Sequence, residues 1–238
     1  MSNIILPKEF ATPPICRPVD DSCVLWISGR GSRRQDSVLN DLSKKGNNGV
    51  IHGATWVNTP LGHSALSFDG VDDYVNCGND ESLNIADAIT IEAWVKPQFN
   101  SQNKRILMKN SGTSSLYAYR ISARTTGKFI FFIGATNGTY RSVEGTTTYS
   151  SNNWYHVVAT YDGAQLKLYV NSEMDNTPTN VSTNIITTNG NLDIGGRRSK
   201  AYIEYWEGLI DEVRIYNRAL SAKEIKEQYN STCHFYGK

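Results

Sequence analysis

The stretch that decides the fold is Tyr155-His-Val-Val-Ala-Thr-Tyr161, followed by Asp162-Gly163 and then by Gln165-Leu-Lys-Leu-Tyr-Val170. The two flanking runs are rich in β-branched and aromatic residues, which are typical of β-strands. Asp-Gly tolerates the positive φ angles of a type I′ turn, so the stretch predicts a β-hairpin. Strands joined by so tight a turn must run antiparallel.

The same pattern extends along the chain in both directions. Asn137-Gly138 predicts a second hairpin, and no long helical pattern is present to supply the crossovers of a parallel sheet. The sequence therefore predicts an all-β fold, a two-sheet antiparallel sandwich. The predicted strands are Cys23–Ile27, Ala54–Val57, Ala65–Phe68, Asp73–Asn76, Ile89–Lys96, Arg105–Lys109, Leu116–Ala123, Phe129–Ala135, Thr139–Val143, Tyr155–Tyr161, Gln165–Val170, Leu192–Ile194 and Leu209–Tyr216.

Two further segments refine this prediction. Ser221–Gln228 is expected to be a short C-terminal helix, because Ser221 and Glu224 have the spacing of a capping box. Phe129–Ala135 is apolar on both faces of the expected strand. That composition indicates a central strand whose outer face is also covered, by loops, a ligand or a partner.

The first 22 residues differ from the rest of the chain. Four of the seven prolines lie there, and they favour extended backbone. We therefore expect residues 1–22 to form an extended arm and residues 23–238 to form the sandwich domain. Apolar residues of the arm, such as Phe10, favour docking on its own domain or on a neighbour, which would support a homo-oligomer or a particle assembly.

Composition excludes several classes of partner. The 24 Lys+Arg and 23 Asp+Glu leave a net charge of +1, which argues against binding to nucleic acid. The longest apolar run, residues 129–135, is too short for membrane insertion, and the N-terminus lacks the pattern of a signal peptide. The expected location is an extracellular surface or a virion. The four cysteines show no Cys-x-x-Cys spacing, so disulfide pairing stays open, with Cys16 to Cys233 favoured if the chain ends lie close together.

Five ordered blocks resemble a known family. They are Ala65–Val75, Ile89–Pro97, Trp154–Gly163, Leu166–Asn171 and Gly208–Ser221. Together they resemble the laminin-G-like (LamGL) branch of the concanavalin A-like lectin/glucanase superfamily, over about residues 23–230. The resemblance implies a jelly-roll sandwich of two antiparallel sheets. It does not assign a function, since such sandwiches include lectins, adhesion domains, hydrolases and virion proteins.

Catalysis is not expected. A glycoside hydrolase needs two carboxyl groups beside the scissile bond, and the glucanase branch resembled here uses a Glu-x-Asp-x-x-Glu type of strand. This chain has Ile210-Asp-Glu-Val213, with Leu209 where the first Glu should stand. It also lacks a Gly-x-Ser-x-Gly elbow and a phosphate-binding loop. Glycoside hydrolysis is kept as a second alternative function.

The turn Asp69-Gly-Val-Asp-Asp73 places three aspartates within five residues. Carboxylate oxygens on a glycine-containing turn suit Ca²⁺, and the resemblance implies a structural calcium with Asp211 in the matching block. The candidate ligands are Asp69, Asp72, Asp73 and Asp211. In the alternative interpretation, the same carboxylates only accept hydrogen bonds from the turn backbone.

Sugar binding requires aromatic faces together with planar polar groups. Trp94 alternates with Glu92 and is expected to point away from the core, and Tyr117 and Tyr119 are expected on one strand face with Arg120 on the other. The loop 197–207 combines cations, carboxylates and aromatics. The candidate ligand-binding residues are Trp94, Tyr117, Tyr119, Tyr169, Arg197, Arg198, Tyr202, Glu204, Tyr205 and Trp206.

These observations favour a non-catalytic, surface-displayed binding module of the lectin or adhesion type, which recognises a glycan or a protein partner. The alternative is a structural particle protein, such as a virion decoration or fibre subunit, anchored by residues 1–22. A calcium ion is the one cofactor expected, in a structural role.

Overall fold

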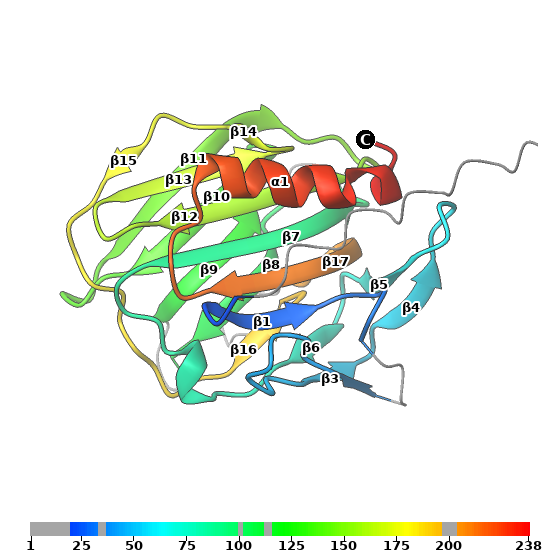
Figure 1. The fold of residues 1–238 in the computed structure, drawn as a ribbon, viewed down its shortest axis with the longest axis horizontal. Coiled ribbons are helices and arrows are strands. Elements are labelled where there is room, and N and C mark those ends of the chain that lie inside the picture. Colours follow the sequence, from blue (N-terminus) through cyan, green and yellow to red (C-terminus); the bar gives the residue numbers. More distant parts are fainter. Residues whose placement is uncertain (1–19, 33–36, 100–101, 112–115, 197–203) are drawn as a thin grey trace, which may run out of the picture.

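The structure is a computed structural model that describes residues 20–32, 37–99, 102–111, 116–196 and 204–238. Its described strands form two antiparallel sheets (Figure 1). The nine-stranded sheet contains β1 (Cys23–Ile27), β4 (Thr55–Asn58), β5 (Ser64–Asp69), β7 (Ile89–Pro97), β12 (Tyr155–Tyr161), β13 (Gln165–Val170), β14 (Glu173–Met174), β15 (Thr179–Asn180) and β17 (Glu207–Tyr216). The eight-stranded sheet contains β2 (Val38–Leu39), β3 (Gly49–His52), β6 (Tyr74–Asn76), β8 (Lys104–Asn110), β9 (Tyr117–Ala123), β10 (Lys128–Gly134), β11 (Tyr140–Thr148) and β16 (Leu192–Ile194).

The predicted sandwich is confirmed. Both hairpins form, with β12 and β13 antiparallel around Asp162-Gly163, and β10 and β11 antiparallel around Asn137-Gly138. Each predicted strand is present, with ends shifted by a few residues for the longer ones. The sequence pattern missed β2, β3, β14 and β15, which are two to four residues long and too short to show an alternation.

One hydrophobic core lies between the sheets. Phe131 of β10 and Ile121 of β9 come from the eight-stranded sheet, and Ile91 of β7 and Val157 of β12 come from the nine-stranded sheet. All four side chains are fully buried in the same cluster. The two sheets therefore depend on each other for burial of their inner faces.

The predicted helix is α1 (Ala222–Thr232), which continues into the 3-10 helix η2 (Cys233–Tyr236). Ser221 caps α1, and the capping box with Glu224 is confirmed. We call α1 and η2 together the C-terminal cap. The cap lies over the outer face of the nine-stranded sheet (Figure 1), where Trp94 of β7 donates from Nε1 to Thr232 Oγ1 at 3.0 Å.

Strand β17 occupies the middle of the nine-stranded sheet, between β7 and β5, and it also pairs with β1. Its pairing with β7 contains a bulge, because Asp211 pairs with Trp94 while Arg214 pairs with Glu92. Glu212, within the bulge, has a φ of 50°. The extra residue places Asp211 and Glu212 on the outer face, beneath the cap.

Two sequence expectations concern the ends and the thiols. Residues 1–19, which include most of the expected arm and Cys16, lie outside the described residues, so the boundary at residue 22 stays a prediction. Cys23, Cys77 and Cys233 are free thiols.

No described helix is long and apolar enough to cross a membrane.

Candidate functional site

The outer face of the eight-stranded sheet carries a continuous row of cross-strand neighbours. None of the described helices packs on this face, because the cap lies on the other sheet and the 3-10 helix η1 (Glu81–Leu83) inserts Leu83 into the core. The row contains, in order, Val38, Val50, Asn76, Asp193, Met108, Arg120, Phe132 and Ser142. The side chains are polar and aromatic toward the β9, β10 end of the row.

A bulge in β9 gives this end its character. Lys109 pairs with Tyr119 and the next residue, Asn110, pairs with Tyr117, so Ala118 is the extra residue. Ala118 and Tyr119 both enter the core, and Tyr117 is turned to the outer face. The expectation that Tyr117 and Tyr119 share a face opposite Arg120 is therefore wrong.

Three rings and one guanidinium group pack together there. The rings of Tyr117 and Tyr140 are stacked, with centroids 4.2 Å apart and an interplanar angle of 14°. The Arg120 guanidinium carbon lies 4.5 Å from the Tyr117 centroid and 4.3 Å from the Phe132 centroid. Cation–π contacts on both rings hold the guanidinium group in one orientation.

An ion pair borders these rings. Arg105 Nε donates to Glu204 Oε2 at 2.6 Å, and Arg120 Nη1 lies 3.8 Å from the same oxygen. We call Arg105, Tyr117, Arg120, Phe132, Tyr140 and Glu204 the tyrosine–arginine cluster. Burial raises the pKa of Tyr117 to about 12 and lowers the pKa of Arg120, since both charged forms lose water. Arg120 Nε and Ser122 Oγ are buried on this face without a hydrogen-bond partner among the described residues.

The structure places the predicted ligand-binding residues in four groups. Tyr117 and Glu204 belong to the tyrosine–arginine cluster. Tyr205, the residue after Glu204, is buried. Arg197, Arg198 and Tyr202 lie outside the described residues.

Four predicted ligand-binding residues are instead inaccessible, and these assignments are corrected. Trp94 does face away from the core, as expected, but its ring is fully buried under Tyr236, with centroids 4.0 Å apart. Tyr169 is buried against the cap together with Ile225. Tyr119 and Trp206 are fully buried in the core, where tertiary packing uses their ring area. None of these four rings is free to stack on a ligand.

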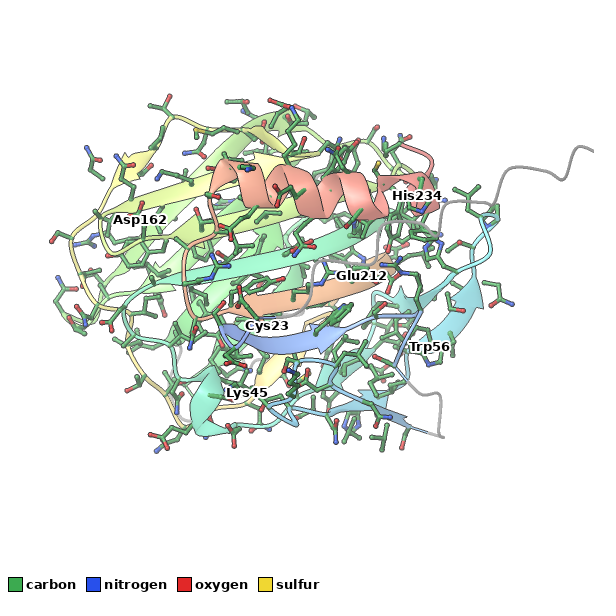
Figure 2. All side chains as sticks on the ribbon, viewed as in Figure 1. Cys23, Lys45, Trp56, Asp162, Glu212 and His234 are labelled. Carbon is green, nitrogen blue, oxygen red and sulfur yellow. The ribbon has the colours of Figure 1, made fainter. Side chains whose placement is uncertain are left out.

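A buried charge cluster lies beneath the cap. Glu92 Oε1 accepts from His156 Nε2 and from Arg214 Nη1, both at 2.9 Å. Glu212 accepts from Arg214 and from Arg30 Nη2, the latter at 2.8 Å. Burial alone would raise the pKa of Glu92 and of Glu212, but the Arg214 guanidinium lowers both overall. Figure 2 shows Glu212 on β17 below α1.

Asp211 completes this cluster. Its carboxylate accepts from Gly29 N at 2.7 Å and from the Tyr236 hydroxyl at 2.7 Å. Burial, with the adjacent charge of Glu212, raises the pKa of Asp211 to about 7. Two acids thus converge in the Ile210–Val213 segment, but the cap encloses them and the chain's own donors occupy them. This enclosure is the geometry of a packed polar interface rather than of a groove for an oligosaccharide.

The Asp69–Asp73 turn brings together three of the four expected metal ligands. One carboxylate oxygen from each of Asp69, Asp72 and Asp73 lies within 4.8 Å of the others. The same carboxylates accept from the turn backbone, as Asp73 Oδ2 does from Asp69 N at 2.8 Å. Asp211 is not part of this group and instead binds Tyr236, so its assignment as a ligand is wrong.

Sequence reasoning did not assign Arg105, Arg120, Phe132 or Tyr140 to the site. The apolar character of both faces of Phe129–Ala135 was the available signal for Phe132, because it indicated a covered outer face. Arg105 and Tyr140 lie at or near strand ends, where the alternation gives little information. Their proximity to Arg120 depends on strand order, which a single sequence does not supply.

These features define a class of protein: an antiparallel jelly-roll sandwich that presents aromatic and charged side chains on one outer sheet face. The family model Laminin_G_3, described as the concanavalin A-like lectin/glucanases superfamily, matches residues 69–226. The match covers more than half of the chain. The chain therefore belongs to this family.

Solved structures share the fold at low identity. The binding domain of Paraclostridial Mosquitocidal Protein 1 has a TM-score of 0.72 and 18% identity, over 92% of this chain and 55% of that chain. Domain 4 of AbnA, a GH43 extracellular arabinanase from Geobacillus stearothermophilus solved with arabinotriose, has a TM-score of 0.67 and 17% identity, over 87% of this chain and 98% of that chain. A Trypanosoma rangeli sialidase mutant displaying trans-sialidase activity has a TM-score of 0.65 and 19% identity, over 90% of this chain and 33% of that chain.

These likenesses show the fold alone. The chain spans about half the length of the toxin binding domain that it resembles. A comparison with curated proteins finds no match.

Proposed function

We propose that this chain is a non-catalytic glycan-binding module whose ligand lies on the outer face of the eight-stranded sheet, at the tyrosine–arginine cluster. The observation that carries the proposal is the half-buried Tyr140 ring, which stacks on the buried Tyr117 ring beside two guanidinium groups and one carboxylate. Aromatic rings suit the apolar face of a pyranose, and the charged groups suit its hydroxyls.

Two further observations support the proposal. The relatives include a toxin binding domain and an arabinanase domain solved with arabinotriose. The acids that a hydrolase would need are enclosed beneath the cap, where Tyr236 binds Asp211. We place the module outside the cell, where glycans are displayed and where the arabinanase relative acts.

A glycan array with site variants tests this function. We expect binding to at least one glycan class, and Phe132→Ala and Tyr140→Ala should weaken it about three- to tenfold, since each removes a ring from the site. The matched control is Tyr74→Ala. Tyr74 is a half-buried ring stacked on His52 in β6, four strands from Phe132 and five strands from Tyr140 in the same sheet. Absence of binding to acidic, neutral and amino sugars would refute the function.

We further propose that the Asp69–Asp73 turn holds one structural Ca²⁺. Three carboxylate oxygens within 4.8 Å of one another are hard ligands of the kind that Ca²⁺ prefers. Glu207, which pairs with Asp69 across β17 and β5, adds a fourth carboxyl group beside the turn. In this arrangement the ion fixes the turn and takes no part in ligand recognition.

A further inference from the structure

The tyrosine–arginine cluster contains an arginine whose binding capacity is not used by the described residues. Arg120 Nε is buried without a hydrogen-bond partner. The nearest anionic oxygen is Glu204 Oε2, at 3.8 Å from Nη1, which is too long for a hydrogen bond. The Glu204 carboxylate is instead committed to Arg105, at 2.6 Å.

Among the described residues, Glu204 carries the one carboxylate within ion-pair distance of Arg120, and that carboxylate is shared with Arg105. The next acidic side chain in the row is Asp193, two strands from Arg120, which corresponds to about 10 Å at the usual strand spacing. Burial of an incompletely paired cation is unfavourable, and burial does lower the pKa of Arg120. An anion at this point would relieve the cost.

The rings determine which anion fits. Tyr117 and Phe132 lie in a T-shaped arrangement, and both rings contact the guanidinium group. These two contacts fix its orientation, so its N–H edge is presented to a ligand in a defined direction. The edge formed by Nε and one terminal nitrogen is a two-donor fork that matches a planar carboxylate. The Tyr140 ring, stacked on Tyr117, lies beside it and offers aromatic surface for a sugar ring.

Building on the proposed glycan-binding function, we infer that the tyrosine–arginine cluster recognises a carboxylate-bearing sugar, with the Arg120 fork as its carboxylate donor. Ser122, whose Oγ is buried without a partner on the same face, supplies a hydrogen bond to a neighbouring hydroxyl group. A sulfate ester is the competing anion. It is tetrahedral and does not match the planar fork as well.

The experiment uses the full chain and matched glycans: a uronic or sialic acid oligosaccharide, the same oligosaccharide after reduction of its carboxyl group, and a sulfated neutral oligosaccharide. Binding is measured by calorimetry at two salt concentrations. We expect the carboxylated form to bind at least tenfold more tightly than the reduced form, with an advantage that shrinks at high salt. Arg120→Gln should remove the advantage, and Arg120→Lys should restore only part of it, since lysine keeps the charge but not the fork.

The control variant is Lys223→Gln, which makes the same charge change on the cap, where the Lys223 side chain is 86% exposed. It should bind like the wild type, and melting curves establish that each variant is folded. Equal binding of the carboxylated and reduced forms would overturn the carboxylate inference and leave glycan binding intact. Preference for the sulfated form would also overturn it. Failure to bind any of the three glycans or any array glycan would refute both proposals.

Discussion

Asp211 is a titratable residue of β17 that contacts the cap directly, through the Tyr236 hydroxyl. Its carboxylate lies between Glu212, which repels its charge, and the Tyr236 hydroxyl, which donates to it. His63 Nε2 lies 3.8 Å away, and burial lowers the pKa of this imidazole to about 4, so it is neutral near pH 7. No cation other than the Arg30 and Arg214 pairs of Glu212 faces this pair of acids in the described cluster.

The raised pKa of Asp211 predicts a pH dependence of stability. Its pKa is about 7 in the fold against an ordinary value of 3.8, so the folded state holds the proton more tightly. The stabilisation is complete below about pH 4 and is lost as the pH rises through 7. Asp211→Asn cannot ionise, so its free energy of unfolding relative to wild type should increase between pH 4 and 8, by up to roughly 4 kcal/mol.

Urea unfolding of both proteins at pH 5 and pH 8 measures this difference. His63 contributes in the opposite direction, since its lowered pKa makes the fold more stable as the pH rises from 4 to 6.5. Over this pH range Asp211 is itself protonated in the fold, so His63 meets an uncharged side chain in both proteins and its contribution largely cancels. Parallel stability curves for wild type and Asp211→Asn would contradict the prediction.

Residue-level prediction from the sequence succeeded where a local pattern was enough. The alternation of Glu92 and Trp94 correctly placed Trp94 on the outer face of β7. The pattern did not show that α1 would cover that ring, because helix docking depends on contacts far apart in the sequence. Tyr117 was placed with Tyr119 because one bulged residue, Ala118, reverses the face of every residue beyond it.

At the scale of elements, the β5–β6 turn connects the two sheets. Asp69 ends β5 of the nine-stranded sheet, and Tyr74 begins β6 of the eight-stranded sheet. Burial raises the pKa of Asp73, and its carboxylate packs against Gly53. An ion bound here would therefore stabilise a link between the sheets as well as the turn.

We expect calcium to raise the melting temperature and a chelator to lower it. Ligand binding to the folded state alone stabilises it by mass action, and each kcal/mol corresponds to roughly 2–4 °C for a domain of this size. Asp72→Asn should abolish the response, because it removes one of the three clustered carboxylates. Asp21→Asn, an exposed aspartate away from the turn, is the matched control. An unchanged melting temperature of the wild type with calcium and with chelator would exclude the site.

At the scale of the whole molecule, one core joins the two sheets. Phe131, fully buried on β10, lies in the same cluster as Val157 of β12. The two inner faces have no other place to bury their apolar area, so we expect the sheets to unfold together.

Phe131→Ala should reduce the free energy of unfolding by about 3–5 kcal/mol, because it removes a ring and leaves a cavity. The loss should be the same by tryptophan fluorescence and by far-UV circular dichroism. Val38→Ala, at an exposed position of β2, should change stability by less than about 0.5 kcal/mol. Two separate transitions for the two probes would show that the sheets are independent.

The sequence was sufficient to predict the fold class of the whole molecule, but not the order of the strands within each sheet. The Asp162-Gly163 and Asn137-Gly138 turns and the period-two runs were sufficient to indicate an antiparallel sandwich. They did not show that β17 lies between β5 and β7, since that pairing joins strands more than 100 residues apart. The tyrosine–arginine cluster was only partly predicted for the same reason, because Glu204 meets Arg105 and Arg120 through tertiary contacts.

The central place of β17 has a consequence for biosynthesis. Until the ribosome has released residues 207–216, β5 and β7 each keep one ribbon edge with unsatisfied amide and carbonyl groups. A nascent or truncated chain that ends before Glu207 therefore exposes two unpaired strand edges. It would need a chaperone or rapid completion of synthesis to avoid aggregation.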